Sequence, residues 1–153
     1  YGYQAQGQLD GDAPQDFQPE AALDSVREFA KPCDSAALPE FFLTLEILTP
    51  TWRSRLLSPT PGHWQEGYRN LARYFVERYY LQAVSDYDLV GRVKLAVVSC
   101  LLISNLGGDF IQTAQVYSKE IENDADNIEA ILDGAYTSPA LVDIGLLSLL
   151  LEE

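Results

Sequence analysis

Apolar residues recur along this chain at intervals of three and four, which is the spacing of one face of an α-helix. One such stripe runs from Phe110 to Leu132, and another runs from Trp64 to Ala83. No segment sustains the alternation of apolar and polar residues that a half-buried β-strand requires. The pattern therefore predicts an all-α protein, a helical bundle of about seven or eight helices.

Proline, glycine and small polar residues mark where these helices are expected to begin and end. Thr49 precedes Pro50 and is expected to cap one helix, and Ser85 or Asp86 is expected to cap another. Gly134 follows the stripe at 110–132 and is expected to end that helix. The predicted helices cover residues 19–30, 38–48, 50–57, 64–84, 88–106, 110–133 and 139–151.

The segment 88–106 is apolar on nearly all of its faces, so we expect it to be the buried central helix of the bundle. Its longest apolar run, 95–106, is too short to span a bilayer. Residues 1–16 are rich in Gln, Gly and Asp and lack apolar periodicity, so they are expected to form a flexible N-terminal arm or linker. The remainder, 17–153, is expected to be a single all-helical domain.

The formal net charge of −13 is unevenly distributed along the chain. Residues 52–94 carry seven bases and four acids, whereas residues 95–153 carry one base and ten acids. Overall acidity argues against nucleic acid and against an anionic membrane as partners. The acidic flanks could neutralise the basic middle within one fold, or could bind a basic protein partner. The chain has only two cysteines and opens without a secretory leader pattern, which favours a cytoplasmic location.

The segment YSKEIENDADNIEAILDG (117–134) places six carboxylates in eighteen positions. A calcium loop beginning at Glu122 would need glycine at its sixth position, where this chain has Asn127, so we expect no metal site. With a single histidine, His63, the chain also lacks a histidine-based metal site. Two interpretations remain, a solvated helix face and an acidic docking face. The first is favoured for Asp124, Asp126 and Glu129, which lie largely off the apolar stripe.

The segment RYFVERYYLQAVSDYDLVGRVKLAVVSC (73–100) alternates tyrosines with basic residues. Such residues could stack against a planar ligand, or could be core rings with arginines extending past them, which residue types alone favour. Asp86 and Asp88 could cap the next helix, and Asp88 could pair with Arg92 four residues later.

The segments YFVERYYLQAVSDYDLVGRVKLAVVSCLLI (74–103) and YSKEIENDADNIEAIL (117–132) resemble the C-terminal region of bacterial flagellin lysine-N-methylases. The resemblance covers roughly residues 40–135. It implies methylation of lysines in flagellin, or in another lysine-bearing protein, with S-adenosylmethionine as donor. An iron–sulfur cluster of that family would belong to a cysteine-rich N-terminal region that this sequence does not include, so the chain is expected to be inactive alone.

Within this interpretation, the matched residues give candidate sites. Tyr117, Glu120 and Glu122 are the catalytic candidates, because a carboxylate or a tyrosine beside the lysine amine could orient it and accept its proton. The substrate-binding candidates are Asp86, Asp88, Arg92 and Asn127. The competing hypothesis is a non-enzymatic acidic helical module that recruits a partner protein.

Overall fold

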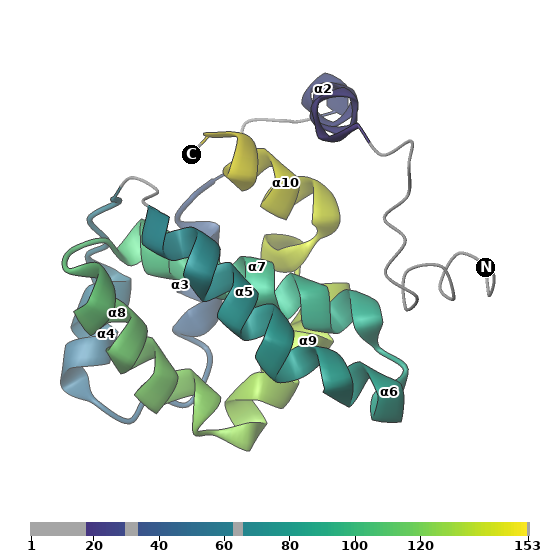
Figure 1. The fold of residues 1–153 in the computed structure, drawn as a ribbon. Coiled ribbons are helices and arrows are strands. Elements are labelled where there is room, and N and C mark those ends of the chain that lie inside the picture. The colour runs from purple at the N-terminus through teal and green to yellow at the C-terminus, as the bar shows by residue number, and fades with distance from the viewer. Residues whose placement is uncertain (1–17, 30–33, 63–65, 153) are drawn as a thin grey trace. The chain divides into compact units, whose positions relative to one another are not determined.

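The computed structural model describes residues 18–29, 34–62 and 66–152, and divides the chain into two compact units, residues 1–30 and 31–153. The described elements are helical, with no strand among these residues, which confirms the all-α prediction. The predicted arm at 1–16 lies outside the described residues, as does His63. The helices are α2 (Pro19–Phe29), α3 (Ala37–Phe42), α4 (Pro50–Leu57), α5 (Glu66–Tyr79), η1 (Tyr80–Gln82), α6 (Ala83–Asp86), α7 (Leu89–Leu106), α8 (Phe110–Tyr117), η2 (Ser118–Glu122), α9 (Ala125–Thr137), η3 (Pro139–Leu141) and α10 (Asp143–Glu152) (Figure 1).

In the first unit, α2 begins at Pro19, as the sequence predicts, because proline lacks the amide hydrogen that has no partner in a first helical turn. Glu20 in the first turn and Arg27 in the last turn both favour the helix dipole. Arg27 also pairs with Asp24 at 2.6 Å. Both side chains are exposed, so this pair adds little to stability.

In the second unit, α7 is the central helix. It contacts α3, α5, α6, α8, α9 and α10, and its residues from Leu95 to Leu106 are buried with few exceptions. The helix is long and apolar enough to cross a membrane, but 61% of it is buried by the surrounding protein. Cys100 is one of these buried residues, and burial raises the pKa of its thiol to about 12.

The connection from α7 to α8 requires glycine. Gly107 follows α7 with a φ of 58°, and a Cβ atom there would lie 1.7 Å from the carbonyl oxygen of Thr60. The Gly62 amide donates to the carbonyl oxygen of Ser104 at 3.0 Å, which brings the 58–62 loop against the end of α7. Only a residue without a side chain permits this approach.

The predicted helix at 38–48 is wrong in its second half, because α3 ends at Phe42. Two backbone amides in the segment that follows donate to side chains from the far end of the sequence. The Glu46 amide donates to Asn127 Oδ1 and the Leu48 amide to Glu120 Oε2, each at 2.9 Å. These hydrogen bonds take the place of the backbone hydrogen bonds that a longer helix would have given the two amides. Thr49 then caps α4 as predicted, accepting from the Trp52 amide at 3.2 Å.

The predicted continuous helix at 110–133 is also interrupted. α8 ends at Tyr117, the π-helical turn η2 covers the SKEIE segment, and Asp124 caps a new helix, α9, by accepting from the amides of Asp126 and Asn127. A π turn adds one residue to a helical turn and so rotates the residues after it. The π turn and the break at Asp124 together change the helical register, so that Asn127 is buried, whereas Ala125, a member of the predicted stripe, is exposed.

Gly134 does not end α9, which continues to Thr137. A Cβ atom at this position would lie 2.7 Å from the ring of Phe41 and 3.2 Å from Leu141. The glycine is therefore needed for close packing between α9 and the residues around α3 and η3, rather than for a left-handed turn.

Candidate functional site

Glu120, a predicted catalytic residue, lies in the interior and is only 1% exposed. Its carboxylate accepts hydrogen bonds from the Leu48 amide at 2.9 Å and from the hydroxyl of Thr49. Because Thr49 in turn caps α4, the carboxylate holds the start of that helix against η2. This geometry gives Glu120 a structural function.

Asn127, predicted to bind substrate, is also buried and is bonded entirely within the chain. Its Oδ1 accepts from the Glu46 amide at 2.9 Å, and its Nδ2 donates to the carbonyl oxygens of Glu46 at 2.9 Å and of Glu120 at 3.0 Å. An amide side chain supplies the donors and the acceptor that this non-helical backbone requires. Asn127 therefore fastens the segment after α3 to η2.

Tyr117 is fully buried, and its hydroxyl lies 2.6 Å from Ser99 Oγ on α7. Its ring contacts those of Phe42, Trp52 and Phe75. Burial raises the pKa of Tyr117 above its ordinary range, so the phenol stays protonated. The structure thus places Tyr117 in the aromatic core.

Glu122, the third catalytic candidate, is at the centre of a polar cluster, and its side chain is 3% exposed. Its Oε1 accepts from the hydroxyls of Tyr74 at 2.9 Å and Tyr79 at 3.1 Å, and lies 3.1 Å from Nε of Arg78. Burial, reinforced by the Glu122 carboxylate, raises the pKa of Tyr74 to about 12, and burial also raises that of Tyr79. Both phenols therefore remain donors at neutral pH, and Arg78 balances the carboxylate charge.

Asp86, Asp88 and Arg92 lie together at the turn between α6 and α7. Arg92 Nε donates to Asp86 at 3.1 Å, and this bond, with the Asp88 amide, lowers the pKa of Asp86. Asp88 is the cap of α7, accepting from the Gly91 amide at 2.8 Å, and it also accepts from the hydroxyl of Tyr136. Asp88 therefore caps the helix, one of the two caps predicted, whereas the predicted pairing of Asp88 with Arg92 is wrong, because Arg92 pairs with Asp86.

These residues line a cleft of about 530 Å³, here called the acidic cleft, whose lining comes entirely from 78–92 and 122–133. Five carboxylates line it against two guanidinium groups. Three of the carboxylates, Asp86, Asp88 and Glu122, are already bonded within the chain. The other two, Glu129 and Asp133, stand one turn apart on α9, and their carboxylates have no hydrogen-bond or ion-pair partner among the described residues.

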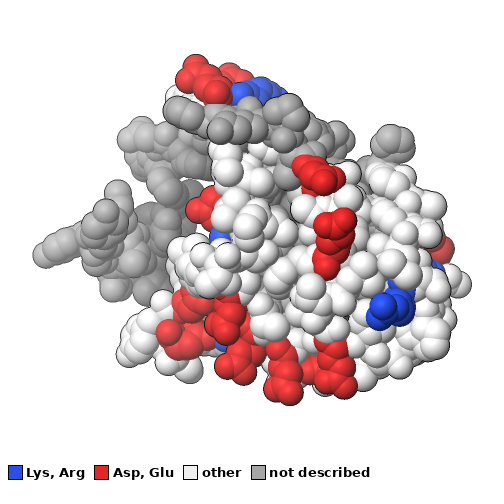
Figure 2. All heavy atoms as spheres, turned by 180° about the vertical axis from the view of Figure 1, so that it is seen from behind, with Lys and Arg blue, Asp and Glu red and all other residues white. Residues whose placement is uncertain are grey.

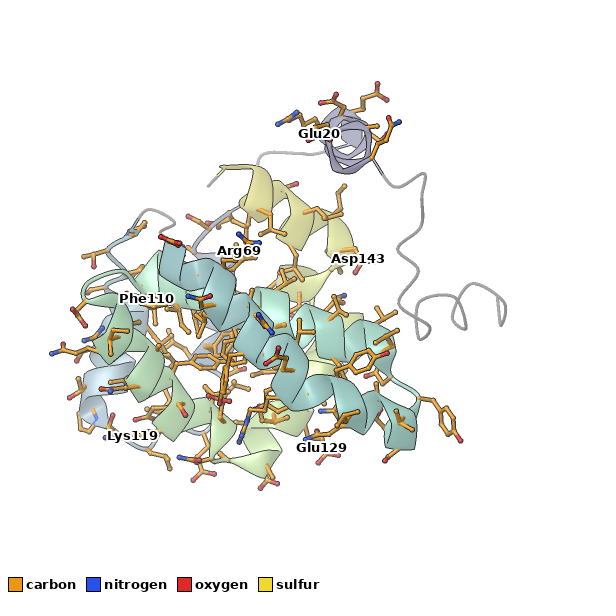
Figure 3. The ribbon with its side chains drawn as sticks, in the orientation of Figure 1. Glu20, Arg69, Phe110, Lys119, Glu129 and Asp143 are labelled. Carbon is orange, nitrogen blue, oxygen red and sulfur yellow. The ribbon has the colours of Figure 1, made fainter. Side chains whose placement is uncertain are left out.

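Acidic side chains are also prominent on one face of the molecule (Figure 2). Acidic side chains gather along the lower edge of the face in Figure 2, at the height of the η2–α9 segment in Figure 1. Glu129 is labelled on α9 in Figure 3. Apolar contact inside the acidic cleft is supplied by Ile128 and Leu132 of α9 and by the Tyr79 ring. The arrangement can receive a cation that carries an aliphatic stem.

Four of the seven predicted site residues therefore meet at one cleft: Glu122, Asp86, Asp88 and Arg92. The other three, Tyr117, Glu120 and Asn127, lie in the interior. Sequence reasoning did not single out Glu129 and Asp133 as a pair, although their i, i+4 spacing on a helix was a usable signal. It noted Arg78 and Tyr79 only as members of an aromatic and basic segment.

Among the described residues, no group of three or more His, Cys, Asp or Glu side chains is arranged to hold a metal ion. Residues 125–133, where a calcium loop starting at Glu122 would continue, are helical. Comparison with known proteins gave no match to a family model, to a curated protein or to a solved structure.

Proposed function

We propose that this chain is a protein-interaction domain that binds a lysine side chain of a partner in the acidic cleft. One observation carries the proposal: Glu129 and Asp133 face the cleft with carboxylates that no group of the described chain pairs. Two such carboxylates one helical turn apart attract an ammonium group, which can donate to both. Arginine is the alternative cation.

The rest of the acidic cleft suits the same ligand. The methylene stem of lysine is apolar, and Ile128, Leu132 and the Tyr79 ring supply apolar surface for it. Arg78 and Arg92 are paired with Glu122 and Asp86, so neither guanidinium competes for the two carboxylates on α9. The partner is therefore a lysine-bearing protein rather than nucleic acid, and a cytoplasmic location is part of the proposal.

A titration followed by amide chemical shifts tests this proposal. The chain is titrated with a lysine-containing peptide and with the same peptide carrying norleucine, which keeps the stem and lacks the charge. We expect shifts around Glu129 and Asp133 with the lysine peptide only. The double variant Glu129→Gln, Asp133→Asn should raise the Kd of the lysine peptide by about threefold or more, because it removes two partly exposed charge pairs with the lysine ammonium group.

The matched control is Asp126→Asn, which removes a carboxylate from the exposed surface of the same helix without touching the cleft. If the double variant weakens binding no more than Asp126→Asn does, attraction is diffuse and the cleft is not the site. Binding should also weaken as salt rises, since partly exposed charges are screened over about 8 Å at physiological salt.

A second candidate is the lysine-N-methylase domain that the resemblance implies, with flagellin as substrate and S-adenosylmethionine as donor. The observation that favours it is that the two segments carrying the resemblance supply every lining residue of one cleft except Asp133. In that function the cleft would hold the lysine, and the donor would bind mainly to another part of the enzyme. Two cysteines are too few for an iron–sulfur cluster, so none is assigned to this chain.

The assignment of the donor site to another part of the methylase is tested by calorimetry with S-adenosylmethionine and by mass spectrometry of flagellin incubated with the donor and the chain. The expected result is weak or absent donor binding by this chain and no methylated lysine. Tight donor binding would place the donor site within these residues and overturn that assignment.

A further inference from the structure

A second cleft lies beside the acidic one, between α5 and α8, and is here called the apolar groove. Its volume is about 380 Å³. Most of its surface is contributed by apolar side chains, including Leu71, Phe75, Phe110, Ile111 and Ala114. Ile111 is 59% exposed, and Phe110, labelled on α8 in Figure 3, is half-buried. A groove of this kind receives an apolar side chain.

The two clefts meet at one residue. Glu122 lines both of them, Tyr74 lines the apolar groove, and Arg78 and Tyr79 line the acidic cleft. All three of these side chains are held by the Glu122 carboxylate. The polar cluster therefore forms a fixed boundary, with apolar surface on one side and unpaired carboxylates on the other.

We infer that the partner segment carries a large apolar residue close to its lysine, and that the apolar residue occupies the groove while the lysine occupies the acidic cleft. This inference rests on the proposed function and adds a specificity determinant to it. Charge complementarity places the lysine at Glu129 and Asp133. Because Glu122 lines both clefts, the apolar residue that occupies the groove must lie close to that lysine in the partner segment. A free lysine, or a basic tail without a large apolar residue, would leave the apolar groove empty.

The experiment compares four peptides on one Gly- and Ser-rich background: lysine alone, leucine alone, both together, and neither. In the peptide with both, the separation is varied from one to four residues. Amide chemical shifts report each Kd, because they detect weak binding. We expect at least one separation at which leucine tightens binding of the lysine peptide by about tenfold, the effect of burying most of a leucine side chain.

Two variants locate the effect. Ile111→Ser should remove most of the gain from leucine and leave the Kd of the lysine-only peptide unchanged. Leu57→Ser is the matched control, because Leu57 is 60% exposed on α4 and lines neither cleft. The inference is overturned if leucine adds no affinity at any separation, or if Ile111→Ser has no larger effect than Leu57→Ser.

Failure of the proposed function has a different signature. In that case the lysine-only peptide would bind the Glu129→Gln, Asp133→Asn variant as well as it binds the natural chain. A result in which lysine binding depends on these carboxylates while leucine adds nothing would retain the acidic cleft and reject the apolar groove.

Discussion

Replacing Glu120 by alanine should destabilise the protein without removing any group from the acidic cleft. The carboxylate is 1% exposed and accepts from the Leu48 amide and the Thr49 hydroxyl. Hydrogen bonds to a charged group contribute roughly 1.5–3 kcal/mol each, and alanine also removes the cost of burying the charge. We therefore expect the free energy of unfolding to fall by about 2–4 kcal/mol.

Urea unfolding followed by circular dichroism measures this change, with Glu129→Ala as the control. Glu129 is exposed on α9 and its carboxylate has no partner among the described residues, so its loss should alter the free energy of unfolding by no more than about 0.5 kcal/mol. Glu120→Gln, which keeps the shape and loses the charge, should fall between the two. If Glu120→Ala were as stable as Glu129→Ala, the interior placement of Glu120 would be refuted.

Three further predictions follow from single contacts. Asn127→Ala removes three hydrogen bonds to the backbone and should lower the free energy of unfolding by about 2–3 kcal/mol in urea titrations, whereas no change would contradict its buried position. Gly134→Ala should destabilise by about 1–3 kcal/mol despite alanine's higher helix propensity, because its Cβ would meet the Phe41 ring, and a gain in melting temperature would contradict that packing. Tyr74 has a raised folded pKa of about 12, so its contribution is complete below the unfolded tyrosine pKa of about 10 and is lost as pH rises toward 12. Tyr74→Phe should therefore show a smaller loss of stability over that range, and in ultraviolet titration it should lack a tyrosinate signal that rises near pH 12. Loss of a signal that rises near pH 10 would contradict the raised pKa.

Features set by neighbours in sequence could be predicted, and features set by distant residues could not. The caps illustrate the first kind, because Thr49 stands directly before Pro50, the first residue of α4. Glu120 illustrates the second, since its partners Leu48 and Thr49 precede it by more than seventy residues. A helical pattern alone does not show that an acidic residue is buried against a backbone segment that has left its helix.

The π turn η2 and the break after it separate the residues of the acidic run into different environments. The sequence favoured solvation for Asp124, Asp126 and Glu129 and a functional position for Glu120 and Glu122. In the structure Glu120 is buried within η2, Asp124 caps α9, and Glu129 is exposed and lines the acidic cleft. Only Glu122 combines burial with a position at both clefts.

The central claim is that a lysine side chain enters the acidic cleft, and intermolecular nuclear Overhauser effects test it most directly. The chain is saturated with a peptide carrying one lysine, and contacts from the lysine ε-methylene protons are recorded. We predict contacts to the methyl groups of Ile128 and Leu132 and to the ring of Tyr79, which line the cleft. Contacts confined to other surfaces of the chain, or none at saturation, would contradict the account.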